Sequence, residues 1–365
     1  MSEMLSYARL LEQVKNIDVE RYAKTRNFYD GHVSGLSPFI SRGVISPQRV
    51  KSIILSGNSI EKSKMFISEL AWREYFQRIW WQHGEKILTD FYHTQNPTVH
   101  DKLIRNITEG TTSLEAIDGP IRQLLTTGRM HNHARMYVAS LACNIGRAHW
   151  LHHARWMYYH LLDGDVASNS LSWQWVAGIF SNKKYYFNQE NLNRFSGSTQ
   201  TGTFIDCSYE QLESLDVPEE LRDTAEPTLE CKLPESTMPQ LDYDKPLLVY
   251  NSYNLDPEWR AQESANRLLL LEPSHYQKFP VAANVLNFIV STARTFIPGI
   301  QVFTGEFQEI PGLQMFSTVY FKEHPLSNRY QGHADRPDWM FPNIEPRGSF
   351  SSYWKLCEKE LWRNR

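Results

Sequence analysis

Three short stretches decide the fold of this chain: GRMHNHARM at 128–136, DGDVASN at 163–169 and WQW at 173–175. The first lies in a helix predicted for 130–146, whose face opposite the apolar stripe holds small or uncharged residues. Arg135 is the only charge on that helix. A helix without a charged face is buried in the protein, so Arg135 is expected to be buried too. A buried guanidinium requires an anionic partner.

The nearby acidic residues are Asp163 and Asp165, which are the only carboxylates between Asp118 and Glu190. Asp165, Asn169 and Trp173 follow one another at spacings of four, so on a regular helix they share one face. Two acids, one arginine and an amide between aromatic walls suit a planar heterocycle with several donors and acceptors. A buried Arg–Asp pair that only locks two helices together explains the same spacing equally well.

The remaining pattern divides the chain into a helical part and a mixed part. Ser46 as a cap followed by Pro47 at the first helical position predicts a helix over 46–55. Apolar residues at helical spacing predict a helix over 60–84, and further helices are expected over 114–127, 130–146, 148–162 and 166–177. Residues 196–240 are rich in Ser, Thr, Pro and acidic residues, which predicts a linker with one short helix. Short apolar runs at 247–250, 268–271, 300–303 and 317–320, with a helix over 282–296, predict a small parallel α/β layer. We therefore expect a mainly α fold with domains at 1–195 and 241–365, joined by the linker at 196–240.

Composition narrows the function classes. The chain has 365 residues, 41% of them hydrophobic, and no uninterrupted apolar stretch of membrane-spanning length. Four scattered cysteines without a C-x-x-C pair argue against a metal site and predict reduced thiols in the cytoplasm. A net charge of −3 means that any surface for nucleic acid must be local. No G-x-G-x-x-G or P-loop pattern supports an ordinary nucleotide-binding fold.

Together with two earlier stretches, these motifs resemble the FAD-binding core of DNA photolyases and cryptochromes. The earlier stretches are Tyr22-x3-Arg26 with VSGLSPF at 33–39 and GVISP at 43–47, and SELAWREY at 68–75. The resemblance covers residues 20–195 in four collinear blocks. It implies a helical bundle that holds FAD in a folded shape, followed here by the small α/β segment.

The resemblance also implies which residues contact the cofactor. Arg135 would stabilise the reduced anionic flavin, Asp163 would hold Arg135 in place, and the Asn169 amide would face flavin N5. The expected cofactor-binding residues are Tyr22, Val33, Ser34, Leu36, Ser37, Phe66, Arg73, Asn132, Arg135, Asp163, Asp165 and Asn169.

For substrate, the resemblance implies a cyclobutane pyrimidine dimer in damaged DNA. The family's (6-4) enzymes place histidine where this chain has Asn132 and Met136. The expected lesion residues are Glu69, Trp72, Asn132, Met136 and Trp175, and the expected catalytic residues are Glu69, Asn132, Trp150, Asn169 and Trp173. Trp173 and Trp150 match the first two members of the tryptophan chain that reduces the flavin, whereas no tryptophan lies at the third position near Pro97.

Three functions follow from the resemblance. The favoured one is deoxyribodipyrimidine photolyase activity, with damaged DNA as partner, no membrane association and a monomeric state. A cryptochrome-like blue-light photoreceptor without repair is the alternative, and a photochemically inactive flavin- or DNA-binding protein is the third. The family's α/β antenna domain normally precedes its helical domain, and this chain has no room for it there. We hypothesise that 241–365 is a permuted or degenerate antenna-type domain; its second chromophore is unknown.

Overall fold

The computed structural model describes residues 6–363, which form two compact units. The first unit comprises the chain up to Glu20, Ser34–Trp81 and everything from Glu230 onward. The second comprises Arg21–Val33 and Gln82–Leu229. Both units combine segments that are distant in sequence, and the predicted domain boundaries after residues 195 and 240 stay a prediction.

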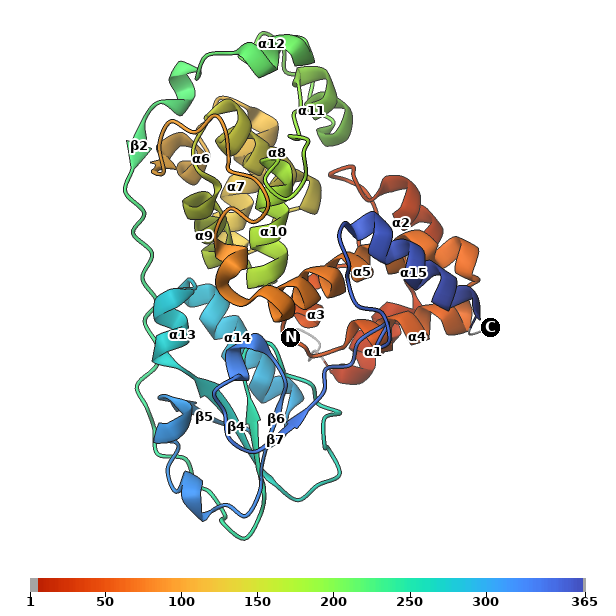
Figure 1. The fold of residues 1–365 in the computed structure, drawn as a ribbon, viewed down its shortest axis with the longest axis vertical. Coiled ribbons are helices and arrows are strands. Elements are labelled where there is room, and N and C mark those ends of the chain that lie inside the picture. The colour runs from red at the N-terminus through yellow and green to blue at the C-terminus, as the bar shows by residue number, and fades with distance from the viewer. Residues whose placement is uncertain (1–5, 364–365) are drawn as a thin grey trace, which may run out of the picture. The chain divides into compact units, whose positions relative to one another are not determined.

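The second unit is a helical bundle around a hydrophobic core (Figure 1). The predicted helices at 114–127, 130–146, 148–162 and 166–177 are all present, with ends that differ by a few residues. The helix predicted for 130–146 is α-helical only to Ser140 and continues as one π-helical turn. The bundle consists of α6 (Arg105–Glu109), α7 (Glu115–Thr127), α8 (Asn132–Ser140), the π-turn (Leu141–Ile145), α9 (Trp150–His160), α10 (Val166–Val176) and α11 (Gln189–Ser196).

The segment predicted as a linker contains one α-helix, α12 (Tyr209–Ser214), as expected. A short antiparallel pair fastens it to the bundle, because β2 (Thr224–Ala225) pairs with β1 (Leu103–Ile104). Sequence composition could not indicate this pairing, since two residues per strand are too few to form a periodic pattern.

Two helices of the first unit, α1 (Tyr7–Lys15) and α4 (Pro47–Gly57), begin with a serine side chain that caps the first turn. The Ser46 side chain accepts a hydrogen bond from the Arg49 amide, and Pro47 is the first helical residue of α4, as predicted. The helices are α1, α3 (Ser37–Ser41), α4, α5 (Ile60–His83) and α15 (Phe350–Arg363). The last two residues of α5 belong to the second unit, and α2 (Val19–Thr25) also contains residues of both units.

The first unit also contains a five-stranded sheet in which all neighbours are parallel, so the predicted α/β layer is confirmed. The strand order is β5-β4-β3-β6-β7. The last strand was not predicted, because its three residues are mostly exposed and include no apolar run. The strands are β3 (Leu247–Tyr250), β4 (Asn266–Leu271), β5 (Gln301–Thr304), β6 (Val319–Lys322) and β7 (His333–Asp335).

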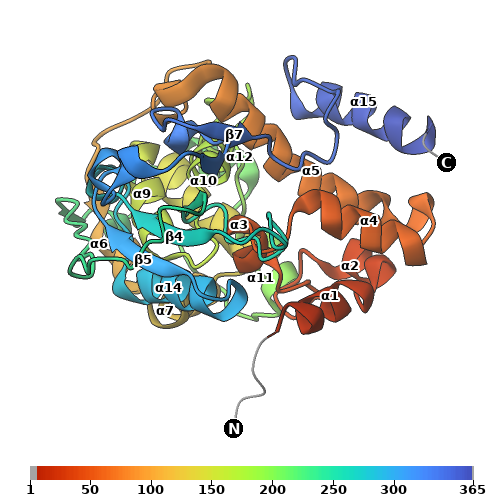
Figure 2. The ribbon, with the colours of Figure 1, turned by 90° about the horizontal axis from the view of Figure 1, so that it is seen from below.

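The two faces of this sheet carry different sets of buried side chains. Leu247 and Val249 belong to a core cluster with Phe303 and Phe307, whereas Leu248 points to the opposite face. The covering helices are α13 (Pro273–Lys278) and α14 (Ala283–Phe296), and Figure 2 shows α14 lying along the sheet beside β5. Because the chain starts at the central β3 and extends first to one edge and then to the other, its direction switches between β3 and β6.

Within residues 6–363 no helix is both long and apolar enough to cross a membrane. The monomeric state and the cytoplasmic location stay predictions.

Candidate functional site

Arg135 on α8 has the anionic partner that its position requires. Its Nη2 contacts both carboxylate oxygens of Asp163 at 2.9 Å, and its Nε donates to the Met130 carbonyl at 3.1 Å. The Asp163 side chain is 8% exposed and that of Arg135 is 23% exposed. The expected burial of Arg135 is therefore only partial, because about a quarter of its side chain stays exposed. In the described part of the chain, Nη1 of Arg135 has no hydrogen-bond partner.

Helix α10 places the next three predicted residues along one face. Asp165 caps the helix, since its Oδ1 accepts from the Ser168 amide at 2.7 Å, and it is almost fully buried. One turn later, Asn169 donates through Nδ2 to the Ala154 carbonyl at 2.8 Å. Trp173 is buried and stacks on His153 of α9 with ring centroids 6.2 Å apart. The Asn169 Oδ1 atom is not engaged by any other described residue.

The predicted lesion residues of the second unit are accessible to different degrees. Asn132 is the first residue of α8 and is exposed, and Met136 is half-buried one turn further on. Trp175 is also half-buried, with its ring 6.2 Å from that of Tyr185. Asn132 and Met136 are four residues apart, so they share one face of the helix. Asn132 lies at the exposed start of α8, whereas Met136 follows Arg135 within the helix and packs against the core of the bundle.

On α5 of the first unit the predicted residues are more enclosed. Phe66 is buried, Glu69 is half-buried, and Arg73 donates to the Ser41 hydroxyl and carbonyl at 3.4 Å. Trp72 stacks on Phe350 of α15, with centroids 3.6 Å apart and ring planes 13° apart. One face of the Trp72 ring is therefore already covered by the chain itself.

Sequence reasoning missed the carboxylate that holds α15 on α5. Glu74 is buried and accepts hydrogen bonds from the Met340 and Phe341 amides and from the Tyr353 hydroxyl. Arg78 pairs with it at 3.2 Å. The i,i+4 spacing of Glu74 and Arg78 can be recognised in the sequence. The backbone amides that donate to Glu74 are 266 and 267 residues away, so sequence spacing does not reveal them.

The predicted phosphate loop is divided between the units, with Tyr22 and Val33 in one and Ser34, Leu36 and Ser37 in the other. The Ser34 hydroxyl accepts from the Leu36 amide at 3.3 Å, and its carbonyl accepts from Gln13 at 2.9 Å. Leu36 is buried, Ser37 and Val33 are exposed, and Tyr22 is half-buried. The roles of these residues toward phosphate stay predictions.

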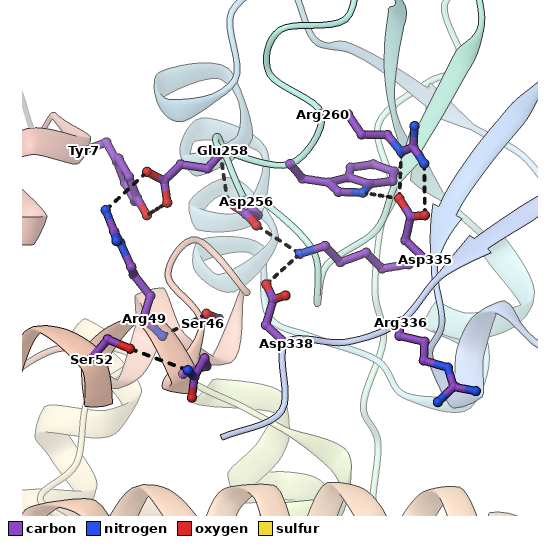
Figure 3. A pocket seen from close by; sticks show the side chains of 13 residues that line it. Tyr7, Ser46, Arg49, Ser52, Asp256, Glu258, Arg260, Asp335, Arg336 and Asp338 are labelled. Atoms are coloured by element: carbon purple, nitrogen blue, oxygen red, sulfur yellow. Dashed lines mark hydrogen bonds and ion pairs between the residues drawn. The ribbon is translucent and has the colours of Figure 1, made fainter. Parts of the chain in front are cut away.

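The first unit also has a cavity of about 550 Å³ that sequence reasoning did not find (Figure 3). The loop after β3, the last residues of β6 and β7 and the segment after β7 line it on one side, where the sheet changes direction, and residues of α1 and α4 line the other side. Most of its charges are paired: Lys322 contacts Asp256 at 2.9 Å, and Arg260 binds Asp335 through Nε and Nη2 at 2.7 and 3.0 Å. Hydrogen bonds from Arg260 lower the pKa of Asp335. The lining is thus polar but close to electrically neutral.

The residues on α8 and α10 fit part of a flavin. The two helices pack together. Between them they offer a fixed positive charge, the unused Nη1 donor of Arg135 and the unused Oδ1 acceptor of Asn169. A flavin ring has donors and acceptors along its polar edge and becomes electron-rich when reduced, so a held arginine and an amide are suitable partners.

Comparison with known proteins identifies the family. Residues 66–252, about half of the chain, match the FAD binding domain of DNA photolyase. A chloroplastic/mitochondrial cryptochrome DASH of Ostreococcus tauri is 34% identical over 194 residues, which cover 49% of this chain and 33% of that protein. A deoxyribodipyrimidine photo-lyase of Vibrio cholerae is 29% identical over 196 residues, covering 46% and 38%.

Among solved structures, a Synechocystis cryptochrome matches with a TM-score of 0.48 and 25% identity, covering 53% of this chain and 44% of that one. This chain therefore spans less than half the length of these relatives. The predicted mainly α fold with a small parallel sheet is confirmed, and so is the predicted cofactor, FAD. The chain belongs to the photolyase/cryptochrome family, whose FAD-binding domain makes up about half of it.

Proposed function

We propose that this protein repairs cyclobutane pyrimidine dimers in DNA by light-driven electron transfer from reduced FAD. One observation on α8 carries the proposal. Asn132 is exposed at the start of α8, Met136 lies one turn later and is half-buried, and Arg135, between them in sequence, is held by Asp163. A single short helix thus offers an amide and a thioether toward a ligand and a fixed cation toward a flavin.

Each residue has a role in this proposal. Bound FAD supplies the photoexcited electron. Arg135 favours the electron-rich state of the cofactor through its positive charge, and Asp163 keeps the guanidinium oriented. The dimer has to leave the DNA stack to reach the cofactor, which costs least at a damaged base pair. Asn132 would then donate a hydrogen bond to the dimer, with Met136 and Trp175 as apolar walls.

Glu69 and Trp72 on α5 are also proposed to contact the lesion, as the family resemblance implies. A half-buried carboxyl group such as Glu69 can hydrogen-bond a pyrimidine edge, and when protonated it can donate to the negative charge on the dimer. Trp173 and Trp150, both buried, would return electrons to the oxidised cofactor. Asn169 would contact the flavin through the amide atoms that the Ala154 carbonyl leaves unused.

A cryptochrome-like photoreceptor without repair activity is the second candidate. The stacking of Phe350 on Trp72 favours it, because a ring face covered by the chain's own helix is unavailable to a pyrimidine. Photochemistry at the cofactor would be the same in both cases, and only the lesion-binding step distinguishes them.

A repair assay separates the two candidates. The purified protein is loaded with FAD, reduced fully and illuminated with blue light in the presence of dimer-containing DNA. The wild type should convert dimers to monomers, and Asn132→Ala should lose most of this activity. Ser172→Ala, an exposed change on α10, is the matched control. Persistence of the dimers with a fully reduced wild-type protein would contradict repair and leave the photoreceptor function.

A further inference from the structure

The indole nitrogen of Trp150 is hydrogen-bonded to a carboxylate. Trp150 is the first residue of α9 and has no exposed surface. Its Nε1–H donates to Oδ1 of Asp90 at 2.9 Å. Withdrawing a carboxylate from water is costly, and a backbone carbonyl would satisfy an indole N–H at a lower cost. Packing alone therefore does not explain why the Asp90 carboxylate is the partner of the Trp150 indole.

Two further donors hold the Asp90 carboxylate. The His149 Nε2 atom lies 3.1 Å from the same Oδ1, and the Gln95 amide donates to Oδ2 at 2.9 Å. Nδ1 of His149 accepts from the Leu151 amide at 3.4 Å, so Nε2 is the nitrogen that carries the hydrogen. The Asp90 and His149 side chains are 21% and 27% exposed. The carboxylate thus connects a fully enclosed indole to water.

The segment from Asp90 to Gln95 is fixed on the start of α9. The buried Gln95 accepts from the Trp150 amide at 2.9 Å and donates to the Ala148 carbonyl at 2.8 Å. These two contacts set the position of Asp90 relative to Trp150 independently of the Asp90–indole bond itself. The arrangement is therefore prepared in the folded protein.

This geometry has a chemical consequence when an indole loses an electron. The oxidised indole is a cation and its N–H becomes acidic. A carboxylate at hydrogen-bond distance stabilises such a charge strongly where water is excluded, and it is also a base for the proton. We propose that Asp90 takes the Nε1 proton of Trp150 when Trp150 gives up one electron, so that the electron-transfer route ends at Trp150. The proposal rests on the photochemistry of the proposed function.

The step balances without another reactant. With photoexcited, oxidised FAD bound as the electron acceptor, Trp173 would give up one electron and would take one from Trp150. Trp173 lies on α10, which packs against α9. The N–H bond of Trp150 breaks and an O–H bond forms on Asp90, which leaves a neutral tryptophan radical and a carboxylic acid. Because the electron can then return only together with the proton, Asp90 replaces the stabilisation that a third tryptophan near Pro97 would provide.

Asp90→Asn tests the proposal, because the amide oxygen can still accept the indole hydrogen bond but cannot take the proton. FAD-loaded, oxidised protein is excited by a laser flash, and transient absorption distinguishes the tryptophan cation radical from the neutral radical. In the wild type the cation should convert to the neutral radical. In Asp90→Asn the cation should persist, and the charge-separated state should decay about tenfold faster or more. Asp101→Asn, an exposed change, is the control and should match the wild type.

A second measurement does not depend on a folded variant. In the wild type, the conversion of cation to neutral radical should slow severalfold in D2O if a proton moves to Asp90. Equal conversion rates in the wild type and in Asp90→Asn, or no tryptophan radical in the wild type, would overturn the proposal. The samples contain no DNA, so this test can be made whether or not the protein repairs dimers. If the proposal for Asp90 fails here, the repair assay is still a valid test of the proposed function.

Discussion

Helices α8 and α5 both carry residues predicted to contact the lesion, yet their surroundings differ. On α8, Asn132 is exposed and Met136 is half-buried. On α5, Trp72 is stacked on Phe350, and Glu74 fastens the segment before α15 through two backbone amides. The motifs indicate both sets of residues equally well. Only the folded chain distinguishes a side chain that is accessible to a ligand from one that another segment already covers.

The largest effect is expected from Arg135→Ala, which tests the α8 side of this comparison. The change removes the bidentate partner of the nearly buried Asp163, which should cost about 3 kcal/mol of unfolding free energy. Flavin content per protein should fall as well, because the fixed positive charge is lost. Thermal unfolding and flavin absorbance measure the two effects, with the exposed Arg129→Ala as control. A variant with full stability and full flavin content would contradict the role given to Arg135.

An intermediate effect is expected from Phe350→Ala, which tests the α5 side. Loss of the half-buried ring should cost about 2 kcal/mol and expose one face of Trp72. If Trp72 is a wall of the lesion site, dimer-containing DNA should then bind severalfold more tightly. Binding is measured in the dark, and Leu356→Ala, which alters an exposed residue of the same helix, is the control. Unchanged DNA affinity despite an exposed Trp72 would remove this residue from the lesion site.

A smaller, graded effect is expected from pH, through His153 in the unit that contains α8. Burial lowers the pKa of His153 to about 3, whereas in the unfolded chain it is about 6.5. Below pH 6.5 the unfolded chain therefore binds a proton that the native protein excludes. Stability should fall as the pH drops from about 6.5 toward 3, by up to about 1.4 kcal/mol per pH unit from this group.

Urea unfolding at several pH values measures that slope. His153→Gln should reduce it, and His93→Gln, which alters an exposed residue, should leave it unchanged. The same slope in His153→Gln as in the wild type would show that the ring is not enclosed as the structure describes.

Much of this arrangement could be predicted from local sequence. An acidic partner for Arg135 at Asp163 or Asp165 followed from a helix with one charge and from two nearby acids, and the family resemblance selected Asp163. The strands at 247–250 and 268–271 followed from short apolar runs. In contrast, β7 and the β1–β2 pair contain too few residues to form a pattern. The contacts of Asp90 with Trp150 and of Glu74 with Met340 join residues 60 and 266 positions apart, and no local spacing encodes them.

The fluorescence lifetime of the reduced flavin tests the central claim most directly. Electron transfer to a dimer competes with emission, so a dimer bound beside Asn132 and Met136 should shorten the lifetime. The measurement compares fully reduced protein with saturating dimer-containing DNA, with the same DNA free of dimers, and without DNA. Repair predicts a shorter lifetime only with the dimer, and Asn132→Ala should restore it toward the DNA-free value. An equal lifetime in all three samples, with DNA binding verified, would contradict electron transfer to the lesion.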